Sequence, residues 1–347
     1  MKLDAVPEGL VETVASLLGV VPSPVIRLLW STVLPRMVVP AMRLGVFEAI
    51  AQDKHDPEDI ARACDCHPEG MAMLLAGLNG FGFLKRRGGR YFLARDTARW
   101  IVASSPSSVR AAMEFSPVLD EMMAGMEDAI RTGQRKNMHE TPHSPQFWKG
   151  YLEGLGAVAR ITGREIAARL RVGSPKRILD VGGGHGCYSV AFCTRFPDAT
   201  AEVLDLPPAA EAGRAIVSRL GFSDRVGFRE GDLRTTPWGD GHDVILLFNV
   251  MHNLPEALAQ EAVHRAYSAL APGGSLVILD GDHAGKSGDL NAAEGFGELF
   301  FYAISSSKTW PEPTLRAWLK AAHFKEARKL RLFTFPNMLL LHARKGA

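Results

Sequence analysis

Short apolar runs alternate with longer, helically patterned stretches from residue 177 to the end of the chain. The apolar runs predict strands at 177–181, 201–205, 226–230, 243–249 and 275–280, with two more near 325–334 and 338–344. The stretches between them predict helices at about 187–196, 208–219, 255–270 and 311–322. Strands that alternate with helices in this way form a largely parallel sheet covered on both faces. We therefore expect residues 171–347 to form an α/β domain whose fold class is a Rossmann-like, doubly wound, seven-stranded mixed sheet.

The first half of the chain has a different pattern, mainly helical with one small β-ribbon. A proline and acidic residues at 56–59 predict the start of one helix, and Pro68 predicts the start of another. Residues 83–93 predict a strand, a Gly-Gly turn and a second strand. This order is typical of a winged helix, so we expect residues 1–105 to form a winged-helix-like domain. Residues 106–170 predict a helical linker rich in methionine and aromatic side chains.

Composition and charge exclude several classes of protein. The 347 residues carry a net charge of +2, which gives no electrostatic support for binding nucleic acid or an anionic membrane. Four cysteines are too few for a disulfide scaffold. The apolar stretch 20–41 is interrupted by four prolines and charged by two arginines, so we expect it to pack against protein rather than cross a membrane. The sequence begins without a signal-peptide pattern, and a cytoplasmic location is the expectation.

The segment 180–186 carries the strongest chemical signal in the chain. It reads Asp-Val-Gly-Gly-Gly-His-Gly and follows the first predicted strand of the sheet. Glycines let the backbone turn tightly and let a ligand lie against bare main chain. A dinucleotide site would need a third glycine where this chain has Ser189. Because Asp180 would repel a pyrophosphate, the turn favours a ligand that carries an ammonium or sulfonium charge.

Three further loops are expected beside this turn, because ligands of a doubly wound sheet bind beyond the carboxyl ends of its strands. Asp205 lies 19 residues beyond Gly186, close to the spacing at which an acid accepts hydrogen bonds from ribose hydroxyls. Asp232 is placed to accept a hydrogen bond from an adenine amino group, with Leu233 over the ring. The predicted cofactor-binding residues are Asp180, Gly182, Gly184, Gly186, Asp205, Leu206, Asp232, Leu233 and Asn249.

These motifs together resemble a known family, the class I S-adenosylmethionine-dependent O-methyltransferases of the dimeric small-molecule type. That group includes the caffeate and acetylserotonin enzymes and many tailoring enzymes of natural-product synthesis. The motifs occur in order over the length of the C-terminal half: Asp180-Val-Gly-Gly-Gly-His-Gly, Asp205-Leu-Pro, Gly231-Asp-Leu, Met251-His and Pro272-Gly-Gly. The resemblance implies S-adenosyl-L-methionine as cofactor, S-adenosyl-L-homocysteine as its product, a homodimer formed through the N-terminal domain, and a role in secondary metabolism.

The resemblance also implies a catalytic base. In the family, the histidine at the position of His252 takes the proton from the acceptor hydroxyl, a role that suits a side chain with a pKa near neutrality. The family also has acidic residues that flank or orient this histidine, and one of them matches Glu298. The chain departs from the family at Asn253, where an aspartate is usual, and at Thr309, where a glutamate is expected. We therefore expect His252 to have fewer carboxylate partners, which would make it a weaker base.

Two alternatives to O-methylation follow from these departures. In the first, the enzyme methylates carbon on a tetrapyrrole or similar ring, and His252 only orients the substrate. In the second, the chain is a winged-helix regulator that senses the cofactor. A DNA reader should carry a basic surface, whereas the predicted helix at 68–79 has neither lysine nor arginine. For this reason we expect no nucleic-acid partner.

The acceptor and metal assignments complete the sequence-based expectations. In the resembling family the region 106–170 forms part of the acceptor pocket, and methionine-rich surfaces adapt to varied ligands. The predicted substrate-binding residues are Met126, Phe147, Trp148 and Asn253. Cys64 and Cys66 lack a second Cys/His pair at zinc spacing, so we expect them to pack in the core. His139 and His143 flank a Thr-Pro break, which predicts a loop rather than a ligand pair, and no metal is expected.

Overall fold

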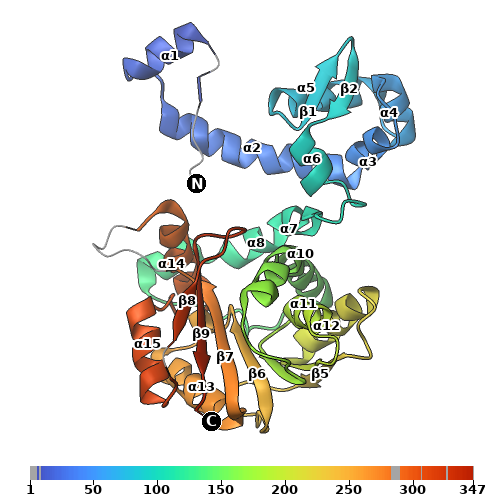
Figure 1. Ribbon diagram of the computed structural model, residues 1–347. Helices are drawn as coiled ribbons and strands as arrows, with labels where there is room; N and C mark the ends of the chain where they lie inside the picture. The colour runs from blue at the N-terminus through green and yellow to red at the C-terminus, as the bar shows by residue number, and fades with distance from the viewer. Residues whose placement is uncertain (1–5, 8, 283–289, 306, 326, 347) are drawn as a thin grey trace. The chain divides into compact units, whose positions relative to one another are not determined.

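The computed structural model describes residues 6–7, 9–282, 290–305, 307–325 and 327–346 (Figure 1). The chain forms two compact units, Met1–Ser116 and Pro117–Ala347. Helix α10, Pro145–Arg169, begins after a capping residue, Ser144, whose side chain accepts a hydrogen bond from the Phe147 backbone. This helix lies in the second unit with the sheet, so residues 117–170 of the expected linker belong to the larger unit and residues 106–116 to the smaller one.

The second unit contains the seven-stranded mixed sheet that the alternating pattern predicts, which confirms the fold class. Its strands lie in the order β5-β4-β3-β6-β7-β9-β8, and only β9 is antiparallel to its neighbours. The strand bounds are β3 Arg177–Val181, β4 Thr200–Asp205, β5 Val226–Glu230, β6 His242–Phe248, β7 Leu270–Gly281, β8 Arg328–Leu330 and β9 Met338–Arg344. The strand order reverses at β3, because β4 and β5 follow it on one side and β6 and β7 lie on the other. Ligands of doubly wound sheets bind at this switch point.

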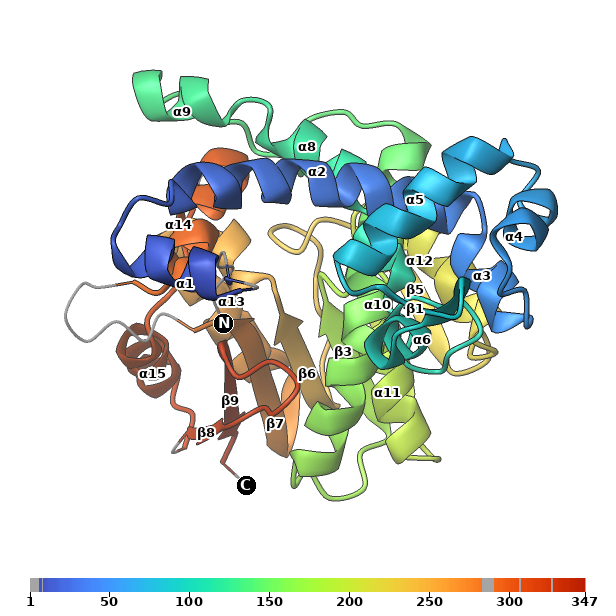
Figure 2. The same cartoon turned by 90° about the horizontal axis from the view of Figure 1, so that it is seen from above.

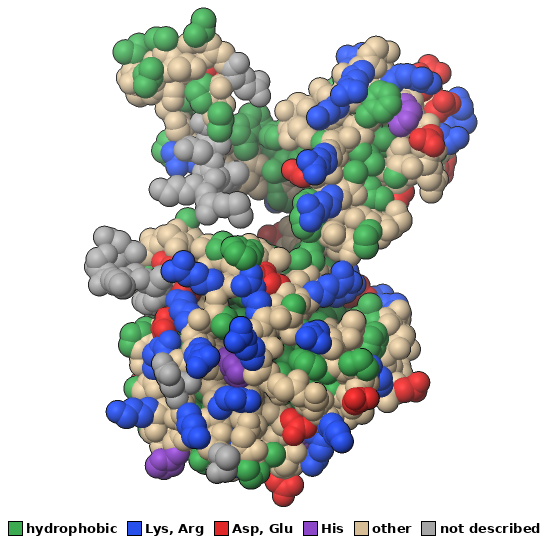
Figure 3. Space-filling view, viewed as in Figure 1, with side chains coloured by type: hydrophobic (Ala, Val, Ile, Leu, Met, Phe, Trp, Pro, Cys, Tyr) green, Lys and Arg blue, Asp and Glu red, His purple; other side chains and the backbone are tan. Residues whose placement is uncertain are grey.

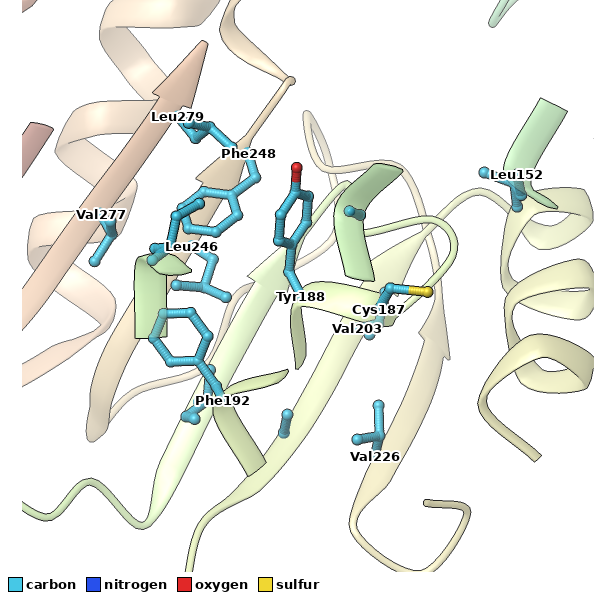
Figure 4. Packing of buried hydrophobic residues seen from close by; sticks show 14 of the residues in the cluster. Leu152, Cys187, Tyr188, Phe192, Val203, Val226, Leu246, Phe248, Val277 and Leu279 are labelled. Atoms are coloured by element: carbon cyan, nitrogen blue, oxygen red, sulfur yellow. The ribbon is translucent and has the colours of Figure 1, made fainter. Parts of the chain in front are cut away.

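Helices cover both faces of the sheet (Figures 1 and 2). One face holds α10 with α11 Cys187–Arg195 and α12 Pro207–Arg219, and the opposite face holds α13 Glu256–Ala269 and α15 Glu312–Ala321. The side chains of β6 alternate between two hydrophobic clusters: Leu246 and Phe248 pack toward α11, and Ile245 and Leu247 pack toward α13. In Figure 4, Tyr188 of α11 points at Phe248, and the two rings meet edge to face with centroids 4.8 Å apart. Both faces of β6 are buried, and its residues 244–248 accordingly form a continuous apolar run.

The shorter elements of this unit come before the first strand of the sheet or between its strands in the sequence. They are α8 Ser116–Met123, α9 Met126–Thr132, the 3₁₀ turn η1 Met251–Asn253 and α14 Ala292–Ser305. The turn η1 directly follows β6, and α14 follows β7. Both therefore lie beyond the carboxyl ends of the central strands, where the ligand crevice is expected.

The first unit has the predicted order of helix, helix and hairpin around its own hydrophobic core. Its elements are α1 Leu10–Leu17, α2 Ser23–Arg43, α3 Val46–Ala51, α4 Pro57–Ala63, α5 Pro68–Gly80, β1 Leu84–Arg87, β2 Arg90–Leu93, α6 Arg95–Trp100 and α7 Arg110–Glu114. Arg110 ties α7 to the core through Glu48 Oε1 at 2.7 Å and the Met42 carbonyl at 2.7 Å. Cys64 and Cys66 pack against this core as free thiols, as predicted.

The sequence analysis was wrong about how the prolines affect α2. This helix continues through Pro35 and Pro40, each of which costs one backbone hydrogen bond without ending the helix. By length and composition α2 is the one candidate membrane span among the described residues, although 22% of its apolar window is buried within the protein. Exposed apolar side chains are also prominent on α1, whose Leu10 and Leu17 are more than 80% exposed (Figure 3).

Candidate active site

The glycine turn after β3 requires bare main chain at several positions. Gly182, Gly184 and Gly186 have φ angles of 67°, 43° and 66°, in the left-handed region that side chains disfavour. A Cβ on Gly182 would lie 2.6 Å from a methyl of Val250, and one on Gly184 would lie 2.8 Å from a methyl of Leu152. The turn is therefore held close to neighbouring elements while its own surface stays free of side chains, which is the surface a cofactor needs.

Asp180 is a buried acid without a cationic partner among the described residues. Its Oδ2 accepts a hydrogen bond from Ser189 Oγ at 2.7 Å, whereas its Oδ1 has no hydrogen-bond partner in the described part of the chain. Burial raises the pKa of Asp180 to about 7; the charge of Asp205 raises it further and the Ser189 hydrogen bond opposes the shift. A cationic ligand in the adjacent turn would relieve this unfavourable burial.

Asp205 joins the end of β4 to the glycine turn, as its spacing predicted. Its Oδ2 accepts a hydrogen bond from the Gly184 backbone at 2.7 Å, and its Oδ1 accepts one from the Leu206 backbone at 2.7 Å. Burial raises the pKa of Asp205 to about 6, and the two backbone hydrogen bonds oppose that shift. The predicted cofactor residues at positions 180–186, 205 and 206 are thus contiguous in space.

The Asp232 loop differs in one respect from the sequence-based expectation. The carboxylate, which was expected to be available to an adenine amino group, is bound by Arg234, whose Nε lies 2.9 Å from Oδ2. The side-chain hydrogen bond from Arg234 lowers the pKa of Asp232, and burial opposes this effect. A carboxylate has about four lone-pair sites, so it retains acceptor capacity beside Arg234. The Leu233 carbonyl accepts a hydrogen bond from the Trp238 indole at 3.0 Å, which fixes the loop.

His252 lies in η1 and is oriented by Asp280, a residue that the sequence analysis missed. His252 Nδ1 lies 2.6 Å from Asp280 Oδ1, and the His252 backbone donates to Asp280 Oδ2 at 3.2 Å. His252 is 6% exposed and Asp280 is 1% exposed. The Phe301 ring stacks on the imidazole with centroids 3.7 Å apart. The expectation of a histidine poor in carboxylate partners is therefore corrected: β7 supplies the carboxylate.

Glu298 and Thr309, which the sequence analysis singled out separately, contact one another. The Thr309 hydroxyl donates a hydrogen bond to a carboxylate oxygen of Glu298 on α14. Glu298 also lines a cavity of about 520 Å³ together with Arg135 and Tyr302. The His252 ring is hydrogen-bonded to Asp280, and the catalytic role assigned to Glu298 stays a prediction.

Asn249 and Asn253 support the loop that carries His252. Asn249 adopts a left-handed φ of 56°, and its backbone donates to the Leu279 carbonyl at 2.7 Å. Asn253 Nδ2 donates to the Asn249 carbonyl at 3.3 Å. Asn253 thus takes a hydrogen-bonding position within the loop, and its contact with substrate stays a prediction.

The predicted acceptor residues belong to one hydrophobic cluster. Phe147 and Trp148 are buried at the start of α10, and partly buried Met126 and Phe301 pack against the same cluster. The Phe147 and Trp148 rings meet edge to face with centroids 6.0 Å apart. Because Phe301 also stacks on His252, apolar and aromatic walls reach the edge of the histidine.

Comparisons with known proteins agree with this arrangement. A family model described as an O-methyltransferase domain matches residues 128–306, and one described as an O-methyltransferase dimerisation domain matches residues 26–104. The 3-hydroxy-5-methyl-1-naphthoate 3-O-methyltransferase of Streptomyces sahachiroi is 27% identical over 319 residues, which are 87% of this chain and 88% of the relative.

Two further similarities extend the picture. The bacteriochlorophyllide d C-20 methyltransferase of Chlorobaculum tepidum is 24% identical over 250 residues, covering 69% of this chain and 72% of the relative. The crystal structure of human N-acetylserotonin methyltransferase in complex with S-adenosylmethionine has a similar fold, with a TM-score of 0.79, 20% identity, and coverage of 93% and 97% of the two chains. The chain belongs to the O-methyltransferase family and is an S-adenosyl-L-methionine-dependent methyltransferase with an N-terminal dimerisation domain.

Proposed function

We propose that this enzyme methylates a hydroxyl group of a hydrophobic or aromatic small molecule of secondary metabolism, with His252 as the general base. The observation that carries the proposal is the 2.6 Å contact between His252 Nδ1 and Asp280 Oδ1 at the carboxyl edge of the sheet. A buried histidine held by a buried carboxylate, beside a cofactor turn, is an arrangement suited to proton transfer.

The hydrogen bonds around Asp280 decide which nitrogen of His252 acts. Asp280 Oδ1 also accepts from the Gly281 backbone at 2.7 Å, and Oδ2 accepts from the His252 backbone. Both oxygens of Asp280 thus accept hydrogen bonds from the backbone, and we assign the proton between Asp280 and His252 to Nδ1, which donates to Oδ1. Nε2 is then the free base, and the carboxylate stabilises the imidazolium that forms when Nε2 takes the proton of the acceptor hydroxyl.

The cofactor supplies an electrophilic methyl on a positively charged sulfur. We assign its binding to the turn at 182–186, to Asp180 for charge, and to Asp205, Asp232 and the loops that carry them. Apolar walls from Met126, Phe147 and Trp148 are assigned to the acceptor. Such walls exclude water and align the acceptor oxygen with the methyl group, and alignment supplies much of the rate of a direct displacement.

Methylation of carbon is the second candidate, and one relative favours it. The bacteriochlorophyllide relative is named for a C-20 methylation, and it matches 69% of this chain. In that reaction His252 would orient the ring without removing a proton from oxygen. The similarity to the naphthoate 3-O-methyltransferase covers 87% of the chain and is the reason that O-methylation comes first.

The remaining assignments concern the setting of the enzyme. We infer a homodimer formed through the N-terminal unit, in keeping with the match to a dimerisation domain. A cytoplasmic enzyme without nucleic-acid or membrane partners is consistent with the net charge of +2 and with the biosynthetic relatives.

The test is methyl transfer to hydroxynaphthalenes by the wild type and by His252→Ala and His252→Gln. We expect both variants to lose transfer to oxygen by about 10²- to 10⁴-fold, the usual contribution of a general base, and to bind S-adenosylhomocysteine in calorimetry as the wild type does. Locating the added methyl by NMR separates products methylated on oxygen from those methylated on carbon. Unchanged turnover in His252→Ala would remove the base from the mechanism.

A further inference from the structure

A second histidine, His139, lies in the neighbourhood of His252 and has no role in the proposed mechanism. It belongs to the segment 133–144 between α9 and α10. Charge on His252 and on His143 disfavours protonation of His139. The His143 ring lies beside Trp148, with centroids 6.3 Å apart. The His139 ring also lies beside Trp148, with centroids 6.4 Å apart. Trp148 is one of the residues assigned to the acceptor, so His139 faces the same region.

Hydrogen bonds on both sides of His139 hold it in this place. The Met138 backbone donates to the Ile304 carbonyl at 2.8 Å, which ties the segment to α14 one residue before Ser305. Ser305 Oγ in turn donates to the His252 carbonyl at 3.1 Å. On the other side, Glu140 Oε1 accepts from Arg234 at 2.6 Å, and Arg234 binds Asp232 of the cofactor loop. His139 is therefore fixed between the histidine loop and the cofactor loop.

The segment around His139 is well bonded, whereas its ring has no hydrogen-bond partner among the described residues. Its own backbone donates to Asn137 Oδ1 at 3.0 Å, and the neighbouring His143 Nε2 contacts the Met138 carbonyl at 3.1 Å. Neither ring nitrogen of His139 makes a hydrogen bond to any residue that the structure describes. His139 is partly exposed, and its ring nitrogens are not among the buried unpaired atoms of the described residues, so they are open to a ligand that supplies hydrogen-bond partners.

The charge state of His139 narrows the choice of partner. Burial lowers the pKa of His139 to about 4; His252, His143 and Arg234 lower it further, and Glu140 opposes the shift. The ring is consequently neutral near pH 7 and offers one N–H donor and one nitrogen acceptor. A neutral imidazole suits an uncharged oxygen function, such as a hydroxyl or a carbonyl, on the ligand.

We propose that His139 is an acceptor-binding residue that hydrogen-bonds a second oxygen substituent next to the hydroxyl that His252 deprotonates. The acceptor class is then a vicinal hydroxyarene or hydroxycarbonyl compound, in which two oxygens lie on neighbouring carbons. This inference rests on the proposed function, because it takes His252 as the group that faces the reacting hydroxyl. It adds a determinant of substrate choice that is separate from the base.

The test compares two probes that differ in one oxygen, 2,3-dihydroxynaphthalene and 2-naphthol. Their dissociation constants are measured by fluorescence on full-length protein saturated with S-adenosylhomocysteine, so no methyl transfer is required. We expect the wild type to prefer 2,3-dihydroxynaphthalene by about five- to tenfold, the factor that one hydrogen bond contributes. We expect His139→Phe to bind both probes about equally while its affinity for 2-naphthol stays within about twofold of wild type. We expect His139→Gln, which keeps a donor and an acceptor, to regain part of the preference.

Two further variants separate binding from structure. His143→Phe removes the hydrogen bond to the Met138 carbonyl. Because this loosens the segment 133–144, the variant should bind both probes more weakly and to the same extent. His264→Phe replaces an exposed histidine on α13 and should change neither affinity. The proposal is overturned if His139→Phe keeps the preference, if it weakens both probes equally as His143→Phe does, or if the wild type has no preference or binds neither probe below about 1 mM. Methyl transfer by His252→Ala is assayed separately, so a failed base and a failed acceptor contact give different results.

Discussion

Asp280 at the end of β7 holds the ring of His252 in η1, 28 residues earlier in the chain, through a 2.6 Å contact between Oδ1 and Nδ1. The pairing depends on the sheet, because β6 and β7 are adjacent parallel strands and Phe248 is opposite Leu279. The residues that follow each strand therefore emerge at the same edge. In the proposed mechanism this carboxylate fixes the tautomer and stabilises the imidazolium, so the strength of His252 as a base would depend on Asp280.

The first prediction concerns Asp280→Asn. The amide keeps the size of the side chain but removes the charge that favours a protonated His252, so we expect kcat to fall by about 10- to 1,000-fold. The measurement is kcat together with the affinity for S-adenosylhomocysteine, which should stay near wild type.

Glu298→Gln is the comparison for this prediction. Glutamine still accepts a hydrogen bond from Thr309, and Asp280 is the acid hydrogen-bonded to the His252 ring. We expect a much smaller loss of kcat than in Asp280→Asn. If Glu298→Gln showed the larger loss, the assignment of the two carboxylates would have to be reversed.

The difference between these two acids shows what the sequence can and cannot predict. The turn at 180–186 is a local feature, since its glycines and Asp180 are consecutive, and the structure has the left-handed backbone they imply. Asp205 is fixed by the length of one strand and one helix. Asp280 has no local signal: an aspartate at the end of an apolar strand acquires its partner only through strand order and register. Arg234 is similar, because only the folded loop brings it onto Asp232.

The second prediction tests how closely α12 supports the cofactor turn. A Cβ on Gly213 would lie 2.1 Å from the Gly184 carbonyl oxygen, a backbone atom that cannot move without displacing the turn. We expect Gly213→Ala to destabilise the protein by about 1–3 kcal/mol, as overpacking does, and to weaken binding of S-adenosylhomocysteine. Denaturant unfolding and calorimetry measure the two effects. Gly227→Ala on β5 is the matched control, because nothing lies within 4 Å of its added Cβ, and loss of stability there would contradict the steric argument.

The third prediction concerns stability in acid. His342 is buried on β9 with Nε2 3.0 Å from Ser275 Oγ, and burial lowers its pKa to about 4, with Arg344 and Arg328 adding to the effect. The unfolded chain binds the proton near pH 6.5, so the stability that this neutral histidine confers is complete above pH 6.5 and is lost as the pH falls toward 4. Between pH 7 and pH 5 we expect the free energy of unfolding to fall by about 1 kcal/mol less in His342→Gln than in the wild type. Thermal unfolding at pH 7 and pH 5 measures it, and an unchanged difference between the two pH values would show that His342 does not contribute.

The fourth prediction follows from the buried, unpaired acid of the cofactor turn. The pKa of Asp180 is about 7 in the folded protein and near 3.9 in the unfolded chain, so the folded state binds the proton more tightly. The ligand-free protein should therefore lose stability as the pH rises from about 4 to about 7, and Asp180→Asn should be more stable than wild type at pH 8 by on the order of 1–3 kcal/mol. At pH 5 the two proteins should differ much less.

The same acid should make cofactor binding depend on pH in the opposite direction. A ligand with a positive charge binds the ionised carboxylate, so the affinity of the wild type for S-adenosylmethionine should increase between pH 6 and pH 8 as Asp180 loses its proton. Asp180→Asn should bind more weakly at pH 8 and lack this increase, even though it is the more stable protein. Calorimetric titration at the two pH values measures both effects. A variant that gained stability and bound the cofactor as tightly as the wild type at pH 8 would mean that Asp180 has no electrostatic role in the site.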